Sequence, residues 1–170
     1  MKKIMFNDKY SLTDAVLERR KTMTRRIVPN KNIIAPTYYV GEVVAIAQSY
    51  STLNQSGYIA PEWLDHSCES SAGYRNKMFV RADLMPHCIK IISVGAQLLQ
   101  DISDEDCLRE GVDKWLDCYI VSGIMENQGR NNVCFETPRE AFSNLIDRIN
   151  GKSTWENNPW VYVYGFELIR

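Results

Sequence analysis

Apolar residues recur along this chain with two different spacings, and together they predict short strands mixed with amphipathic helices. Runs of β-forming residues predict strands at 2–6, 43–47, 78–81 and 89–99. The stretch 160–169 is apolar or aromatic on both faces, which is typical of a strand buried inside a sheet or barrel. We therefore expect an α+β fold with a small β-barrel or curled sheet at its centre and helices flanking it.

The strongest helix signal begins at Thr137, which forms a capping box with Glu140. Apolar residues then recur at helical spacing, at Phe142, Leu145 and Ile149. We expect this stripe to pack on the strand at 160–169.

Two shorter helices are predicted earlier in the chain. One covers 11–19, with Ser11 as its N-cap. The other follows Ser103, a suitable N-cap, and ends before Gly111, which suits a left-handed C-terminal position. Residues 48–77 are polar without clear periodicity, so we expect a long loop there, with a short helix at 61–64.

Composition is that of an ordinary globular chain. Its 170 residues suit a single domain over 1–170, with 45% hydrophobic and 24% charged residues. A net charge of -1 argues against a protein that coats nucleic acid broadly, so any such contact should be a confined patch. No apolar run approaches the roughly 18 residues of a membrane span, and the N-terminus lacks an apolar signal core. We expect a cytoplasmic protein without a membrane partner.

The five cysteines are widely spaced and include no C-x-x-C pair, which favours reduced intracellular thiols over a disulfide framework. A zinc site of His66, Cys68, His87 and Cys88 is disfavoured, because adjacent residues of a strand point to opposite faces. We expect neither a metal nor another cofactor.

Positive charge is concentrated at 19–26, where five of eight residues are cationic. Lys21 stands three residues before Thr24, and a cation beside a hydroxyl can serve a phosphate, a nucleotide or a polar reaction. The alternative is that these cations are solvated and complement the C-terminal end of the preceding helix. If they are functional, Lys21, Arg25 and Arg26 should border a concave, positive surface.

Four blocks of sequence, taken in order, resemble one family. They are Phe6-Asn7 with the later run 20–26, then 39–44, 99–111 and 151–161. Together they resemble ASCH-domain proteins of the branch common in phages and prophages. The resemblance implies a PUA-like β-barrel with flanking helices and a role in binding RNA or a modified nucleoside. Small members of the broader family hydrolyse 4-N-acetylcytidine, and others have been described as ribonucleases.

The hydrolase members use a Lys, a Thr three residues later and a Glu, which match Lys21, Thr24 and Glu110 here. A Lys whose pKa is lowered by partial burial among cations can activate a Thr hydroxyl, and a Glu can hold the Lys or move a proton. Alternatively, the Thr24 hydroxyl is bonded to the backbone and the Glu110 carboxylate is solvated, and neither has a role in catalysis. The residues that we expect to contact the ligand are Arg20, Arg25, Arg26, Gln48, Tyr50 and Arg81.

Three places depart from the family pattern or are ambiguous. Arg19 stands where the family has a Gly, so the turn after the first helix should differ. Residues 47–50 replace the family's Arg-Glu-Thr-Trp, and Tyr50 could be a stacking or a core residue. We interpret Trp155 and Trp160 as barrel packing rather than a platform for stacking bases.

The sequence therefore supports a protein that binds RNA or a modified nucleoside, and it leaves open whether the protein is an enzyme. An amidohydrolase using Lys21, Thr24 and Glu110 is one reading. A non-catalytic RNA-binding module and a ribonuclease are the others. The sequence does not indicate the oligomeric state.

Overall fold

The structure, a computed structural model, describes residues 1–29, 35–58 and 69–170 of a mixed α+β chain. The chain divides into two compact units. The first contains Met1–Phe6, Val43–Ile89 and Ile169–Arg170, and the second contains Asn7–Glu42 and Lys90–Leu168. The expected helix at 61–64 and the zinc candidates at 66 and 68 lie outside the described residues. No helix in the described ranges is long and apolar enough to cross a membrane.

The first unit is built on a parallel pair of strands, β1 (Lys3–Ile4) and β3 (Val43–Ile46). Helix α2 (Tyr50–Gln55) follows within the segment expected to be a loop. The turns η3 (Lys77–Phe79) and η4 (Ala82–Leu84) replace the strand expected at 78–81, so that prediction was wrong. The Asn76 side chain accepts a hydrogen bond from Met78 N at 2.9 Å, and such a local bond stabilises a turn against an extended strand.

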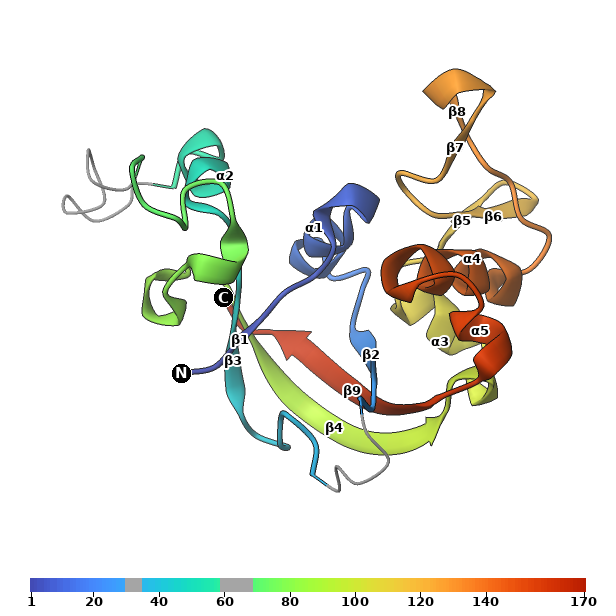
Figure 1. Cartoon of the computed structure of the whole chain (residues 1–170), viewed down its shortest axis with the longest axis horizontal. Coiled ribbons are helices and arrows are strands. Elements are labelled where there is room, and N and C mark those ends of the chain that lie inside the picture. The colour runs from blue at the N-terminus through green and yellow to red at the C-terminus, as the bar shows by residue number, and fades with distance from the viewer. Residues whose placement is uncertain (30–34, 59–68) are drawn as a thin grey trace. The chain divides into compact units, whose positions relative to one another are not determined.

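Strands β4 (Cys88–Leu98), β9 (Trp160–Leu168) and β2 (Met23–Ile27) form the sheet of the second unit in that order (Figure 1). Only the first two residues of β4 belong to the first unit. β9 has a strand on each side, as its two-faced apolar sequence predicted. The pairings among the described residues close no barrel, so the PUA-like barrel stays a prediction.

The helices of the second unit are α1 (Leu12–Leu17), α3 (Asp104–Arg109), α4 (Pro138–Asn150) and α5 (Thr154–Asn157), with the turns η1 (Asp8–Tyr10), η5 (Leu99–Asp101) and η6 (Asn127–Gly129). α4 begins as predicted, since Thr137 Oγ1 accepts from Glu140 N at 3.1 Å. It lies next to α3, α5 and β6 (Cys118–Ile120), and its expected packing on β9 stays a prediction. α5 follows closely in the chain and brings Trp155 edge-on to Phe142, with ring centroids 6.2 Å apart.

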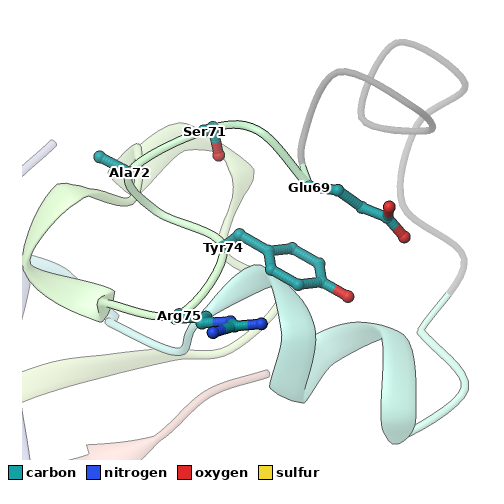
Figure 2. A pocket seen from close by; sticks show the side chains of 5 residues that line it. All are labelled: Glu69, Ser71, Ala72, Tyr74 and Arg75. Atoms are coloured by element: carbon teal, nitrogen blue, oxygen red, sulfur yellow. The ribbon is translucent and has the colours of Figure 1, made fainter.

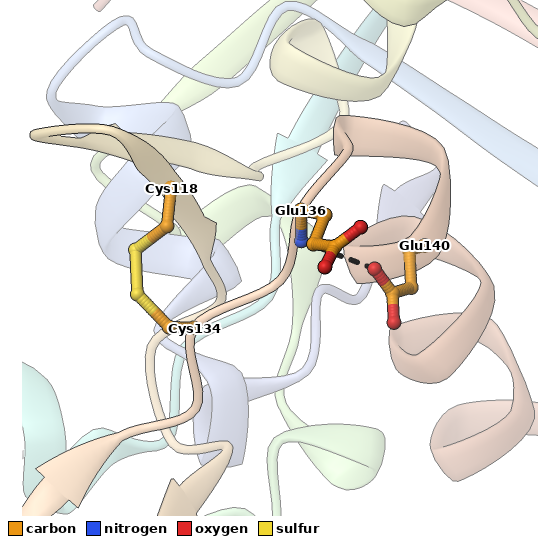
Figure 3. Close-up of a disulfide and its surroundings, with 4 residues drawn as sticks. All are labelled: Cys118, Cys134, Glu136 and Glu140. Atoms are coloured by element: carbon orange, nitrogen blue, oxygen red, sulfur yellow. Dashed lines mark hydrogen bonds between the residues drawn. A yellow bond between two sulfur atoms is a disulfide. The ribbon is translucent and has the colours of Figure 1, made fainter.

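Two short hairpins complete the second unit: β5 (Asp113–Trp115) with β6, and β7 (Met125–Glu126) with β8 (Asn131–Asn132). Cys118 and Cys134 form a disulfide next to the Tyr119–Phe135 bridge (Figure 3). The expectation that all five cysteines are reduced was therefore wrong. The two backbone hydrogen bonds between Tyr119 and Phe135 bring the neighbouring cysteines together, which spacing alone does not reveal.

Helix α1 differs from its prediction at both ends. Ser11 precedes it with φ of 50° and makes no capping bond, and the helix ends at Leu17. Arg19, in the place of the family's Gly, has φ of 63°. The turn thus keeps a left-handed residue, although a side chain makes that conformation unfavourable. Arg19 Nη1 donates to the Leu168 carbonyl at 2.9 Å.

Candidate functional site

A buried ion pair links the residue before β2 to the end of α3. Lys21 Nζ donates to Glu110 Oε2 and to the Glu110 carbonyl, both at 2.7 Å. Only 2% of the Lys21 side chain and 5% of the Glu110 side chain are exposed. Gly111, with φ of 107°, ends the helix directly after Glu110. The sequence predicted that Lys21 and Glu110 would meet, and the structure brings them together.

Arg25 extends the pair into a cluster. Its Nη1 donates to Glu110 Oε1 at 3.0 Å and its Nη2 to Asp106 Oδ2 at 2.9 Å. Each oxygen of Glu110 therefore serves one cation. In the amide orientation that satisfies both groups, the Gln97 oxygen accepts from Arg25 Nη2 and Nε. Arg109 closes the cluster with Nη1 3.4 Å from Asp106 Oδ1.

Two of these partners, Asp106 and Gln97, were missed from the sequence. Asp106 precedes Glu110 by four residues, so the two carboxylates lie on one face of α3. That spacing was a signal for a shared cation. Nothing in the sequence pointed to Gln97, because its place opposite Arg25 depends on the arrangement of the strands.

Burial lowers the pKa of Lys21 below its ordinary value of 10.5. The Glu110 carboxylate opposes this shift, and the charges of Arg26 and Arg25 add to it. The neutral amine is therefore easier to reach than in a solvated lysine. This is the direction expected for a lysine that acts as a base.

Thr24 lies on β2 beside this cluster. Successive strand residues point to opposite faces, so Thr24 and Arg26 share the face opposite Arg25. The Thr24 hydroxyl makes no hydrogen bond within the described part of the chain, although the residue is only 5% exposed. The expected contact between Thr24 and Lys21 stays a prediction.

A pocket of about 290 Å³ reaches Lys21 from outside. Its walls include Lys21, Thr22, Arg19, Arg109 and Glu167. The lining also contains the apolar residues Val16, Ile92, Phe166 and Leu168. Lys21 and Arg109 already pair with Glu110 and Asp106, so the charges of the lining do not by themselves select an anion.

The remaining cations do not form the open patch that was expected. Arg25 is buried in the cluster, and only Lys21 of the three predicted border residues lines this pocket. Arg20 is paired with Glu18 at 2.7 Å and with Asp113 at 2.8 Å. Three of the acids that pair with Arg20 and Arg25, namely Asp106, Glu110 and Asp113, are distant in sequence, so local charge counting cannot include them. The place of Arg26 at a concave positive surface stays a prediction.

The other three predicted ligand residues belong to the first unit. Tyr50 is a buried core residue whose hydroxyl accepts from Arg81 N at 3.1 Å. The Arg81 side chain is exposed and pairs with Asp83 at 2.5 Å. Gln48 Oε1 is buried with no hydrogen-bond partner among the described residues, and such an atom is suited to accept a bond from a ligand. Contact of these residues with a ligand stays a prediction.

The first unit also has a pocket of about 390 Å³, shown in Figure 2. Its lining is polar and contains one acid and one base, Glu69 and Arg75, beside Tyr74. Among the described lining residues the charges balance, so this part of the lining shows no preference for an anion. Within the described ranges, no group of three or more His, Cys, Asp or Glu residues could hold a metal ion.

Comparisons with known proteins give two likenesses of fold. One is an ASCH domain from Lactobacillus crispatus JV V101, with a TM-score of 0.45 and 13% identity over 96% of this chain and 75% of that one. The other is a DUF984 protein from Enterococcus faecalis V583, with a TM-score of 0.48 and 13% identity over 99% of this chain and 80% of that one. The first carries the family name that the four sequence blocks resemble. Neither likeness says what this chain binds or does.

No family model matches the chain, and no curated protein matches it.

Proposed function

We propose that this protein is an amidohydrolase that removes the acyl group from an N-acylated nucleoside of the 4-N-acetylcytidine type. The observation that carries the proposal is Lys21, a buried lysine with a lowered pKa that Glu110 holds at 2.7 Å. Burial disfavours the charged form of this lysine although Glu110 opposes the shift, and groups with perturbed pKa values gather at catalytic sites. The family resemblance supplies the substrate class.

Each residue has a role in the proposed reaction. The neutral Lys21 amine takes the proton of the Thr24 hydroxyl, and Thr24 Oγ1 forms a bond to the acyl carbon. The bond between that carbon and the nucleoside nitrogen then breaks, and the leaving amine receives the proton from Lys21. Water cleaves the resulting ester, which releases the carboxylic acid and restores Thr24. Glu110 keeps the Lys21 side chain in place through both halves of the reaction.

Turnover of 4-N-acetylcytidine to cytidine and acetate tests the proposal. The wild type should release cytidine. Lys21→Met removes the base and Thr24→Val removes the nucleophile while each keeps much of the side-chain volume. Each change should abolish turnover, and the double variant should be no worse than either single one, because the two residues act in one step.

Lys114→Met is the matched control, since Lys114 is an exposed lysine on β5. It should leave turnover unchanged. If the wild type releases no cytidine, or if Lys21→Met turns over as fast as the wild type, the hydrolase proposal fails.

A further inference from the structure

Trp160 does not pack as the sequence suggested. Its side chain is exposed, with 57% of the residue accessible. Trp155 does pack, since Phe142 meets its ring edge-on and Arg139 lies over it with Cζ 5.3 Å from the ring centroid. One tryptophan is therefore structural, whereas the other presents its indole to solvent.

Trp160 forms one wall of a pocket of about 810 Å³, in the size range of small-molecule sites. Tyr162 extends the aromatic wall, and Leu98 and Pro159 provide apolar surface. Two amide side chains, Asn157 and Asn158, also line the pocket. None of the described lining residues carries a charge.

The backbone around this wall is fixed before any ligand arrives. Asn158 is left-handed, with φ of 45°, and its Oδ1 accepts from Gln100 N at 2.8 Å. Leu99 N donates to the Pro159 carbonyl at 2.9 Å, and Val28 N donates to the Trp160 carbonyl at 3.0 Å. Bonds on both sides thus hold the Trp160 backbone, so little ordering cost remains for binding.

We propose that this pocket binds a nucleobase, stacked on Trp160, from a nucleoside or a single strand of RNA. A flat exposed indole suits the π-face of any base, and the amides suit the few polar groups on its edge. A sugar needs more hydrogen-bonding groups than two amides, one of which already has its oxygen engaged. The described part of the lining is uncharged, which does not suit a phosphate. None of these lining residues belongs to the Lys21 cluster, and the proposal does not rest on the hydrolase.

The test is equilibrium binding of cytidine, adenosine and a six-nucleotide RNA, with maltotriose as the sugar probe. Free-nucleoside binding at this site should change little with salt, because a nucleoside has no phosphate from which counterions are released. Trp160→Ala should lower the affinity about 5- to 140-fold, equivalent to roughly 1–3 kcal/mol for one stacked base. Trp160→Phe should recover part of the loss.

Trp115→Ala is the matched control, because Trp115 on β5 is similarly exposed at 61%. It should bind like the wild type. In the wild type itself, the Trp160 indole resonance should shift on addition of ligand, a readout that does not depend on any variant folding.

Three outcomes would each overturn the proposal. They are an unchanged affinity in Trp160→Ala, a Trp160 resonance that does not shift on addition of ligand, and binding of maltotriose without binding of any base. Failure of this proposal can be told apart from failure of the hydrolase proposal, since Lys21→Met should leave the Trp160-dependent binding unchanged.

Discussion

Glu110→Gln is the sharpest probe of the ion cluster, because it keeps the shape of the side chain and removes its charge. In the wild type one carboxylate bonds both Lys21 and Arg25, at 2.7 and 3.0 Å. The amide removes the negative charge that Lys21 meets at 2.7 Å, at a site where 2% of the Lys21 side chain is exposed. Removing one partner of a buried pair typically costs about 3–5 kcal/mol. Domains of this size are stable by about 5–15 kcal/mol, so the loss should be large.

The loss should also depend on pH. Lys21 has its ordinary pKa of 10.5 when unfolded and a lower pKa when folded. Between these two values the unfolded chain binds more protons, so stability rises with pH across this window. Glu110 raises the folded pKa, and the amide would not, so the window should extend to lower pH in Glu110→Gln. The deficit of the variant should therefore shrink as pH rises, apart from the part due to the lost contact with Arg25.

Urea unfolding followed by circular dichroism, from pH 6 to pH 9.5, measures both effects. Asp113→Asn is the control, because it makes the same chemical change in the exposed pair with Arg20 and should cost at most about 1 kcal/mol. Adding Lys21→Met to Glu110→Gln should restore part of the stability, since no buried ammonium then faces the uncharged amide. A deficit for Glu110→Gln that equals the Asp113→Asn control and is flat with pH would refute this reasoning.

Three further predictions concern the fold. Arg19→Gly should be more stable than Arg19→Ala by about 1 kcal/mol in urea unfolding, because both lose the bond to Leu168 but only glycine relieves the left-handed backbone; equal stabilities would contradict this. Cys118→Ser with Cys134→Ser should lower the free energy of unfolding by about 2–4 kcal/mol, since the disulfide closes a loop with a sequence separation of 16, and reduction of the wild type should reproduce the loss. Gly123→Ala should lower the free energy of unfolding by at least about 2 kcal/mol, because the new Cβ would lie 2.1 Å from the Lys9 carbonyl oxygen. Gly129→Ala is the control, because Gly129 has a similar φ and open space around it. An equal loss of stability in Gly129→Ala would assign the cost to the backbone alone.

Local signals predicted some of the regular elements, but they missed β2, α2 and the two hairpins. The Ser103 cap and Gly111 bounded α3, and the Thr137 box began α4, because capping involves neighbours in sequence. The placing of α4 could not be predicted, since several apolar surfaces compete for one stripe and sequence periodicity does not choose among them. The 78–81 segment failed for a related reason, as a side-chain cap at Asn76 outweighed β-forming composition.

In the site, too, contacts between residues distant in sequence could not be predicted from local patterns. The resemblance brought Lys21 and Glu110 to attention, although they are 89 residues apart and no local pattern links them. Local charge density, by contrast, suggested an open patch where the structure has paired and partly buried cations. The exposure of Trp160 was also unpredictable, because an aromatic residue at the start of a strand packs or stays exposed according to what lies across from it.

The most direct measurement of the central claim is the rate of cytidine release from 4-N-acetylcytidine as a function of pH. The account predicts that the rate for the wild type rises with pH through one ionisation below 10.5, as the Lys21 ammonium loses its proton. It also predicts that Lys21→Met, folded like the wild type, shows no such rise and no turnover. Absence of cytidine release by the wild type, or an unchanged pH profile in Lys21→Met, would contradict the account.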